Sequence, residues 1–495
     1  MALIDFKVLP GIDKQDTTAG AENRWVDCDN VRFRYGLPEK VGGWSSLVTD
    51  TIAGVARREF AFVDLDGNRY VAIGTDKFLI IYFEGQLFDI TPLKATLASS
   101  TIATTNASPI CSITTSSDHN LSIGDIVLLD NVTLPVGTGF ANSDFEDKLF
   151  QVTAITSSTV FTITQSSNAT GTVAAAGSLD VKPYEQVGPA EQSYGYGWGI
   201  DSWGTGNWGE AASASSVTLE PGLWSLSNFG QVLVATIANG KTFTWDSGIA
   251  ARLTTRASTT TSGFATTNNP TATRVTLVSP TTRHLIHLGT ETTIGTASTQ
   301  DDMFLRFSDQ EDINDYTATA INSAGDFRLQ DGTKIMGALK AKETILIWTD
   351  NALYTMKFIG APFTFGFEQV GTNCGLIGKN AAVEIDGTAF WMSSNGFFMF
   401  DGTVKTLPCS VEDFVFDQAD TTKGQQIYAG LNNLFTEIVW YYPSQGSDYN
   451  DQYVVFNYGQ PMKGGVWYIG TESRTTWIDA TIYPKPFATK FDDSA

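Results

Sequence analysis

The chain has 495 residues, of which 42% are hydrophobic, 12% aromatic and only 17% charged, and its formal net charge is −22. This acidity excludes a surface that grips nucleic acid through Lys and Arg, although an acidic wall would let a duplex slide past without sticking. The length predicts two or three domains, or one large domain built of repeats. Abundant Thr, Ser, Gly and Asn favour strands and turns over helices.

The four cysteines are far apart and none has CxxC spacing: Cys28, Cys111, Cys374 and Cys409. We therefore expect free thiols in a reducing compartment, without a disulfide framework or zinc site. The first residues lack the basic start and apolar run of a signal peptide. The longest apolar runs, such as Phe78–Phe83, are too short to span a bilayer, so we expect no membrane anchor.

Residues 1–94 are predicted to form an N-terminal anchor and a first blade-like unit. Arg32 and Arg34 alternate with apolar neighbours, which indicates a short half-buried strand. Trp44 ends this segment after two glycines. We single out Arg32, Arg34 and Trp44 as candidate assembly contacts; a core position for Trp44 is an equal alternative.

Composition changes across residues 95–182, where charge thins out and Ser, Thr and Ala dominate. Short alternating strands separated by turns predict a small five- or six-stranded β-barrel. Blade-like units stand on both sides of it, so we interpret it as an inserted domain. His119 lies beside the Gly124–Asp125 turn and is interpreted as a structural partner of that turn.

Six stretches share an order of apolar strand, polar turn and aromatic strand: Gly67–Thr91, Gly230–Thr254, Arg283–Tyr316, Phe327–Gly360, Lys379–Pro408 and Phe435–Gly459. Asn-Gly and Asp-Asn turns between apolar runs are strong hairpin signals. A unit of this kind cannot bury both faces alone. The pattern therefore predicts an all-β chain with a β-propeller of about six or seven blades, continued over residues 183–495. An irregular β-sandwich is the alternative.

Two stretches interrupt the repeats. Residues 193–209 are rich in glycine and aromatic side chains, and we predict a contact loop for assembly carried by Tyr194, Tyr196, Trp198, Trp203 and Trp208. A packed connector, or an aromatic platform for sugars or bases, is the alternative. One short helix is predicted near residues 410–420, with Ser410 as its N-cap.

Catalytic patterns are scarce. His284 and His287 are three residues apart in a predicted strand, so they face opposite sides and share no metal. Nucleophile elbows, phosphate-binding glycine loops and HExxH are absent from the sequence. We therefore expect no enzyme, cofactor or metal site. A glycosidase with paired carboxylates stays an alternative, although Ser393–Gly396 lacks the Asp and Trp of a sialidase repeat.

Four stretches in order resemble the tail hub or nozzle proteins of short-tailed bacteriophages, the group that includes packaged-DNA stabilisation proteins. They are DNVRFRYGLPEKVGGW near the start, Met303–Leu329, Ile345–Gly402 and Phe435–Asp479. The similarity covers most of the chain outside residues 95–182. These motifs are structural, so the resemblance depends on their order and number.

The resemblance implies a virion protein, made in the host cytoplasm, that forms a six-fold ring below the portal and adaptor. Such a ring would continue the DNA channel, retain the packaged genome without reading its sequence, and dock tail fibres or spikes. Hub and terminal nozzle both remain open. The alternative function is a propeller-type glycan- or receptor-binding module.

Overall fold

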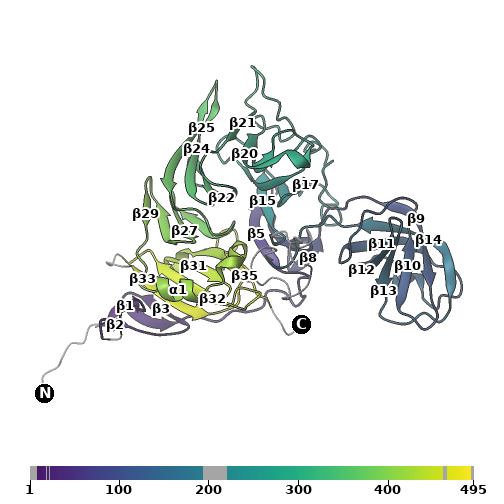
Figure 1. Cartoon of the computed structure of the whole chain (residues 1–495), viewed down its shortest axis with the longest axis horizontal. Coiled ribbons are helices and arrows are strands. Elements are labelled where there is room, and N and C mark those ends of the chain that lie inside the picture. The colour runs from purple at the N-terminus through teal and green to yellow at the C-terminus, as the bar shows by residue number, and fades with distance from the viewer. Residues whose placement is uncertain (1–7, 18, 22, 193–219, 461–464, 492–495) are drawn as a thin grey trace, which may run out of the picture. The chain divides into compact units, whose positions relative to one another are not determined.

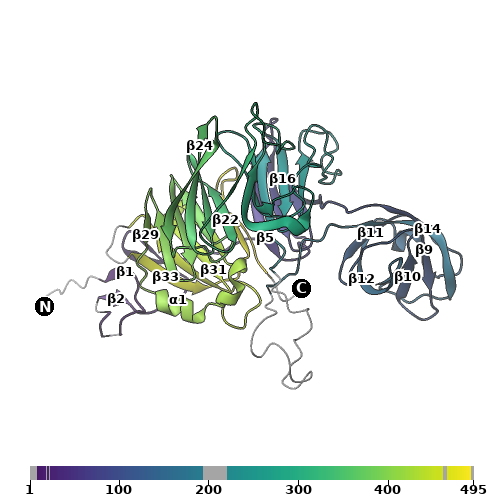
Figure 2. The ribbon, with the colours of Figure 1, turned by 45° about the horizontal axis from the view of Figure 1, so that its top comes forward.

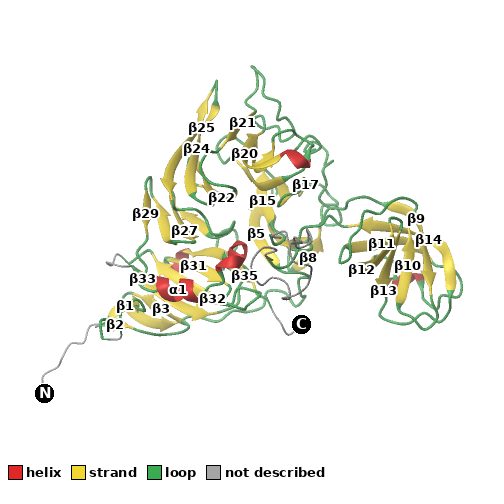
Figure 3. Cartoon of the chain, viewed as in Figure 1, coloured by secondary structure: helices red, strands yellow, loops and turns green. Residues whose placement is uncertain are grey.

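The computed structural model describes residues 8–17, 19–21, 23–192, 220–460 and 465–491. The chain divides into two compact units, one of residues 1–89 with 187–495 and one of residues 90–186. The larger unit is a propeller of β-sheets arranged around a common centre, and the smaller is a closed β-barrel (Figures 1 and 3). The predicted fold class, an all-β propeller with an inserted small barrel, is confirmed.

Six antiparallel sheets form the blades. The first contains β5 (Ala56–Val63), β6 (Arg69–Thr75), β7 (Leu79–Phe83) and β8 (Gln86–Asp89). The second has three strands, β15 (Trp224–Phe229), β16 (Val232–Ile237) and β17 (Thr242–Asp246). The third contains β18 (Thr273–Val278), β19 (Leu285–Glu291), β20 (Gln300–Phe307) and β21 (Gly325–Arg328).

The remaining three blades have four strands each. The fourth contains β22 (Ile335–Lys340), β23 (Thr344–Thr349), β24 (Ala352–Gly360) and β25 (Thr364–Thr372). The fifth contains β26 (Ala382–Ile385), β27 (Thr388–Ser393), β28 (Gly396–Phe400) and β29 (Val404–Thr406). The sixth contains β30 (Tyr428–Asn432), β31 (Glu437–Tyr442), β32 (Gln452–Asn457) and β33 (Val466–Thr471).

The innermost strands follow one another around the centre in the order β5, β15, β18, β22, β26 and β30. A two-stranded sheet of β34 (Thr476–Ile478) and β35 (Phe487–Thr489) closes the ring, because β34 contacts both β30 and β5. Two N-terminal pairs, β1 (Leu9–Ile12) with β2 (Arg24–Trp25) and β3 (Val31–Arg34) with β4 (Leu37–Lys40), lie against β33 (Figure 2).

Five of the six predicted units overlap one blade each, although four of these omit its innermost strand, and the unit Phe327–Gly360 joins strands of two blades. Phe327 lies in β21, the last strand of the third blade, whereas the repeat pattern joined it to the fourth. The loop from β21 to β22 is short and polar, like the hairpin turns within a blade. The sequence pattern therefore cannot distinguish a connection between blades from a turn inside one.

A shared turn explains why the repeats align. Thr75 Oγ1 accepts hydrogen bonds from the backbone N–H groups of Lys77 and Phe78, at 3.1 and 2.7 Å. Thr349 Oγ1 does the same for residues 351 and 352, at 3.1 and 2.8 Å. A threonine at this position satisfies the buried turn from its own side chain, so the two blades share one turn chemistry.

Tryptophan links successive blades. The indole N–H of Trp224 donates to the carbonyl of Thr75 in the preceding blade at 2.8 Å. Trp391 donates to the backbone carbonyl of Cys374 at 2.8 Å, and Trp440 donates to the carbonyl of Ala381 at 3.0 Å. Trp391 and Trp440 are fully buried, so each joins apolar packing to a satisfied polar end.

The smaller unit is a closed six-stranded barrel in the order β10–β13–β12–β11–β14–β9. Its strands are β9 (Leu97–Thr104), β10 (Ile110–Thr114), β11 (Ile126–Thr133), β12 (Lys148–Ser157), β13 (Val160–Thr164) and β14 (Val173–Pro183). Alternate residues such as Cys111 and Ile113 point into a separate apolar core. The observed unit, residues 90–186, contains the predicted segment 95–182.

Helices are short. Within the described ranges the one α-helix is α1 (Glu412–Gln418). Three-residue 3-10 helices occur at Asn142–Asp144, Ala297–Thr299 and Asn433–Phe435, and a kinked six-residue one at Thr421–Gln426. The predicted helix near residues 410–420 is confirmed, but its cap is wrong: Val411 is the N-cap. Ser410 instead donates to the carbonyl of Ile12 at 2.6 Å and ties the N-terminal segment down. Across the described ranges no helix has the length and apolar character needed to cross a membrane.

Candidate functional site

Arg32 forms an ion pair within the chain. Its Nε lies 3.0 Å from Glu437 Oε1 and its Nη2 donates to Glu437 Oε2 at 3.2 Å. Its guanidinium also stacks 3.5 Å above the Phe435 ring, while Arg34 lies farther from that ring, at 5.2 Å. The pair joins β3 to the start of β31, so Arg32 fastens the N-terminal hairpin to the sixth blade. Its predicted assembly role is untested and stays a prediction.

Trp44 is exposed and lies against the closing sheet, so the alternative of a core position is wrong. Its ring meets Trp477 edge to face at 5.2 Å, and the guanidinium of Arg474 lies 4.5 Å from its centre. The predicted contact loop lies outside the described residues, with all five of its named members: Tyr194, Tyr196, Trp198, Trp203 and Trp208.

The histidines fill structural positions. His119 accepts from the N–H of Leu121 at 2.9 Å, as expected for a turn partner. His287 is fully buried, 2.8 Å from Tyr316 Oη, and burial, helped by Arg306, lowers its pKa to about 3. His287 is therefore neutral at physiological pH.

A chain of Asp309, Ser323 and His284 superficially resembles a hydrolase triad. Ser323 Oγ lies 2.6 Å from Asp309 Oδ1 and 2.9 Å from His284 Nε2. In a triad the carboxylate orients the imidazole, whereas here it engages the serine and His284 Nδ1 contacts Thr282. His284 is also fully buried. These hydrogen bonds stabilise the loops of the third blade, and we do not interpret Ser323 as a nucleophile.

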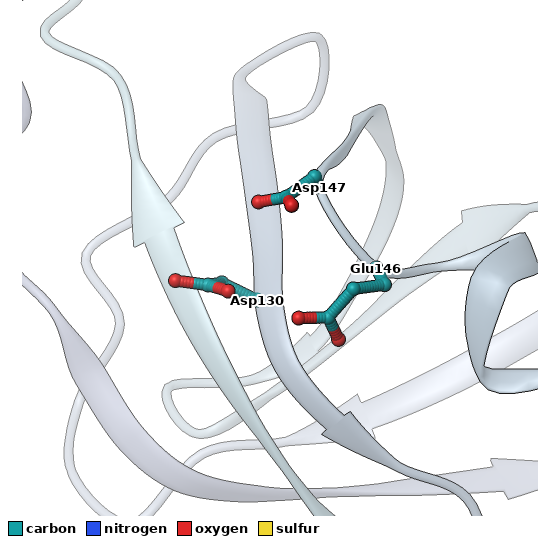
Figure 4. A group of neighbouring side chains, drawn as sticks. All are labelled: Asp130, Glu146 and Asp147. Carbon is teal, nitrogen blue, oxygen red and sulfur yellow. The ribbon is translucent and has the colours of Figure 1, made fainter. Parts of the chain in front are cut away.

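Three carboxylates gather in the barrel, where Asp130, Glu146 and Asp147 lie next to one another (Figure 4). Asp130 pairs with Lys182, whose hydrogen bond is the main cause of its lowered pKa. Glu146 accepts from the backbone N–H groups of residues 131 and 132. Protein donors therefore account for two of the carboxylates, and we assign no metal to this group.

The axis of the propeller holds a cavity of about 400 Å³. Strands from all six blades and the closing sheet line it, chiefly at the innermost positions. Three cationic side chains, Arg58, Lys340 and Lys379, are among the lining residues. They come from the first and fourth blades and from the segment that enters the fifth.

Hydrogen bonds hold these cations in place and cross the axis. Lys379 Nζ donates to Ser225 Oγ at 2.8 Å, and Lys340 Nζ donates to Ser227 Oγ at 2.9 Å. Arg58 Nη1 donates to Asn380 Oδ1 at 3.1 Å. Because the first, second, fourth and fifth blades are joined by these bonds, polar side chains partly obstruct the centre of the propeller.

Burial and mutual repulsion weaken the positive charge of both lysines. Burial, then repulsion from Arg58 and Arg274, lowers the pKa of Lys379 to about 7. Burial and Arg58 lower the pKa of Lys340 to about 8. Glu59 shares the cavity, and burial raises its pKa to about 7 despite a hydrogen bond from Thr476.

Neighbouring cations show the contrasting arrangement. Arg274 Nη2 binds both oxygens of Glu220, at 2.7 and 2.8 Å, and Lys334 Nζ lies 3.0 Å from the same carboxylate. Among the described residues, Arg58, Lys340 and Lys379 make no ion pair of this kind. Glu384 and Asp479 also line the cavity, but they accept from the backbone N–H groups of Gly387 and Asn433, at 2.6 and 3.1 Å.

Exposed apolar side chains gather at two hairpin ends. Phe358, Ile359 and Phe363 lie at the end of the β24–β25 hairpin, which reaches away from the propeller centre in Figure 1, and Phe363 is 73% exposed. Tyr35 and Leu37 lie at the β3–β4 turn, where Tyr35 is 87% exposed. These two groups are the apolar hairpin ends.

Neither a protein-family model nor a curated protein sequence matches the chain. Solved structures with a distant likeness include a computationally designed protein, at 9% identity over 86% of this chain and 91% of that one, with a TM-score of 0.34. BamB from Moraxella catarrhalis is 13% identical over 54% and 79%, with a TM-score of 0.28. The endosialidase of phage phi92 is 10% identical over 93% and 67%, with a TM-score of 0.21. Likenesses this distant decide nothing about function.

Sequence reasoning missed the three cationic side chains that line the cavity. Lys340 and Lys379 look like ordinary polar residues at the ends of strands, and Lys342 nearby is exposed. Only the closed ring brings Lys379 near Arg58, which is more than 300 positions away. The repeat pattern carried no signal for them, because Arg58 lies outside the predicted repeat Gly67–Thr91 and Lys379 lies in a turn before β26.

Proposed function

We propose that the chain is a structural protein of a bacteriophage tail, which assembles into a six-fold ring, as hub or nozzle, around the path of the DNA. The observation that carries the proposal is the pair of apolar hairpin ends on one propeller. The order of the four resembling stretches supports it, and so does the acidic net charge of −22. Portal, adaptor and tail fibres or spikes are the partners that this role requires.

Two different apolar ends suit a ring. A monomer rarely presents large apolar side chains at the end of a protruding hairpin unless they serve contact. The two apolar hairpin ends differ in their residues. One end of a copy would therefore contact a surface of the neighbouring copy that is not the same hairpin end. Heterologous contacts of this kind generate closed rings when the rotation between copies closes.

The DNA would pass through the lumen of the ring of subunits. The axis of each propeller is unsuitable, because Arg58, Lys340 and Lys379 reach into it and bond across it. An acidic lumen would repel phosphates and so let a duplex slide during ejection. Retention of the genome would then depend on neighbouring tail proteins and on the width of the lumen.

Sedimentation velocity of the full chain tests the role of the hairpin end. We expect large assemblies at high protein concentration, and we expect Phe363→Ser to shift them toward single chains because it removes an exposed aromatic anchor. Leu65→Ser is the matched control, since Leu65 is equally prominent, at 84% exposed, on the β5–β6 turn. Equal assembly of both variants would reject the β24–β25 contact.

A further inference from the structure

We propose that the central cavity of the propeller binds a small oxyanion with two or more negative charges, carried by phosphate or carboxylate groups. The ligand would lie among Arg58, Lys340 and Lys379, with the hydroxyls of Ser225 and Ser227 beside it. This inference is independent of the proposed tail function.

The donors around the cavity are oriented and incompletely used. Lys340 Nζ has three N–H groups and uses one, on Ser227. Lys379 Nζ uses two, on Ser225 Oγ and, at 3.4 Å, on the carbonyl of Arg274. An anion of two or more charges can accept the remaining N–H groups simultaneously, and such charge-assisted bonds are stronger than neutral ones.

The three cations are not ion-paired within the described residues, and this favours an anion over a neutral ligand or a cation. The cations repel one another at short range in a partly dehydrated space, which costs free energy in the absence of a counter-charge. Glu220 forms ion pairs with Arg274 and Lys334 and acts on Lys379 only from a longer distance. Among the described side chains, Arg58, Lys340 and Lys379 have no carboxylate within ion-pair distance. The carboxyl group of Glu59 lines the same cavity, and burial raises its pKa to about 7, so partial protonation at pH 6.5 limits its repulsion of an anion.

The volume sets the size of the ligand. A cavity of about 400 Å³ admits a diphosphate or a tricarboxylate with accompanying water, whereas a polymer backbone would have to thread between the crossing side chains.

Lys379→Met and Lys340→Met keep the length of the stem and remove the charge. Lys342→Met is the matched control, because Lys342 is exposed in the turn that follows β22.

Calorimetric titration of the full chain at pH 6.5 and low ionic strength, with pyrophosphate and with citrate in separate arms, tests the proposal. We expect at least one of them to bind, and the arm that binds more tightly identifies phosphate or carboxylate as the preferred group. Each single Lys→Met variant should weaken binding by about tenfold or more, and Lys342→Met should leave it unchanged.

Two results would overturn the anion site: neither compound binds the unmodified chain, or all three variants bind like it. Thermal melts followed by Trp fluorescence accompany each titration and confirm that the variants are folded. A folded variant is expected, because removing an unpaired buried charge in favour of an apolar side chain is commonly neutral or stabilising. Acetate, with a single charge, serves as the ligand control.

Discussion

Arg32 shows how much a single ion pair can decide at the edge of the propeller. Glu437 accepts from Arg32, from Asn432 and from the hydroxyl of Tyr468, and burial raises its pKa. Removing Arg32 would leave this carboxylate buried without its cation. The interaction therefore stabilises the sixth blade and the N-terminal hairpin together.

We expect Arg32→Met to lower the free energy of unfolding by about 3–5 kcal/mol, the usual cost of breaking a buried pair from one side. Arg34→Met should cost less than about 1 kcal/mol, because Arg34 stacks on rings and acts on Glu437 only as the weakest of its neighbouring charges. Urea unfolding followed by Trp fluorescence measures both, since every Trp lies outside residues 90–186. Equal losses would show that the pair adds little.

Lys379 gives the propeller a stability that depends on pH. The unfolded chain keeps this lysine protonated up to its ordinary pKa of 10.5, whereas the folded chain keeps it protonated only up to about 7. The unfolded chain therefore binds more protons between these values, and stability rises with pH across them. The cost of the buried charge is fully present below about pH 7 and is relieved as the pH approaches 10.5.

Lys379→Met should accordingly be more stable than the unmodified chain at about pH 6.5, and the gain should shrink steadily toward about pH 10. Arg58 and Arg274 strengthen the effect and Glu220 opposes it. Melting temperatures of both proteins across this range, with Lys342→Met as the control, measure it. A gain that stays constant with pH would show that the folded chain keeps Lys379 protonated as readily as the unfolded chain, and so that burial does not lower its pKa.

The sequence could predict features that depend on the two-residue period of a strand, such as the side of the sheet that a side chain faces. The alternation of a strand predicts that His284 and His287 face opposite sides, and in the structure they have separate partners, Ser323 Oγ and Tyr316 Oη. The partners of Arg32 and Lys379 could not be predicted in this way. They lie more than 100 positions away along the chain and are brought close only by the folded propeller.

The β34–β35 sheet closes the propeller, and Trp477 is its main anchor. The indole N–H donates to the carbonyl of Leu431 at 2.7 Å. A Cβ at Gly430 would come within 2.6 Å of the Trp477 ring, so this close packing needs glycine at that position. The strand has only three residues, too few for the repeat pattern to reveal it.

Trp477→Ala should lower the free energy of unfolding by about 3–5 kcal/mol, because the ring leaves a cavity between the sixth and first blades. Trp44→Ala should cost clearly less, since Trp44 covers Trp477 from outside and is 43% exposed. The same urea titration distinguishes them. If Trp44→Ala lowers assembly without lowering stability, the predicted role of Trp44 as an assembly contact gains support. A larger loss of unfolding free energy for Trp44→Ala than for Trp477→Ala would contradict this account of closure.

The barrel is a unit with its own core, joined at one place. Both of its ends are held together, because Lys94 N–H donates to the carbonyl of Pro183 and Glu185 N–H donates to that of Pro92, each at 2.9 Å. A closed barrel leaves no free sheet edge. The change in composition and the alternating strands were sufficient to predict this unit, because both signals are local.

Replacing residues 90–186 with a short Gly/Ser linker should leave the melting of the propeller unchanged, and the excised segment should unfold cooperatively by itself. Trp fluorescence follows the propeller, and circular dichroism follows the barrel, which has no Trp. Loss of a cooperative propeller transition in the deletion variant would show that the two units depend on each other.

Ring assembly is the central claim, and electron microscopy of the purified full chain tests it most directly. Negatively stained particles prepared at high protein concentration would be classified by symmetry, beside the Phe363→Ser variant. We predict closed rings with an open centre, six-fold in symmetry, and mostly single propellers for the variant. Single propellers from the unmodified chain at every concentration would contradict the ring and favour the glycan- or receptor-binding alternative.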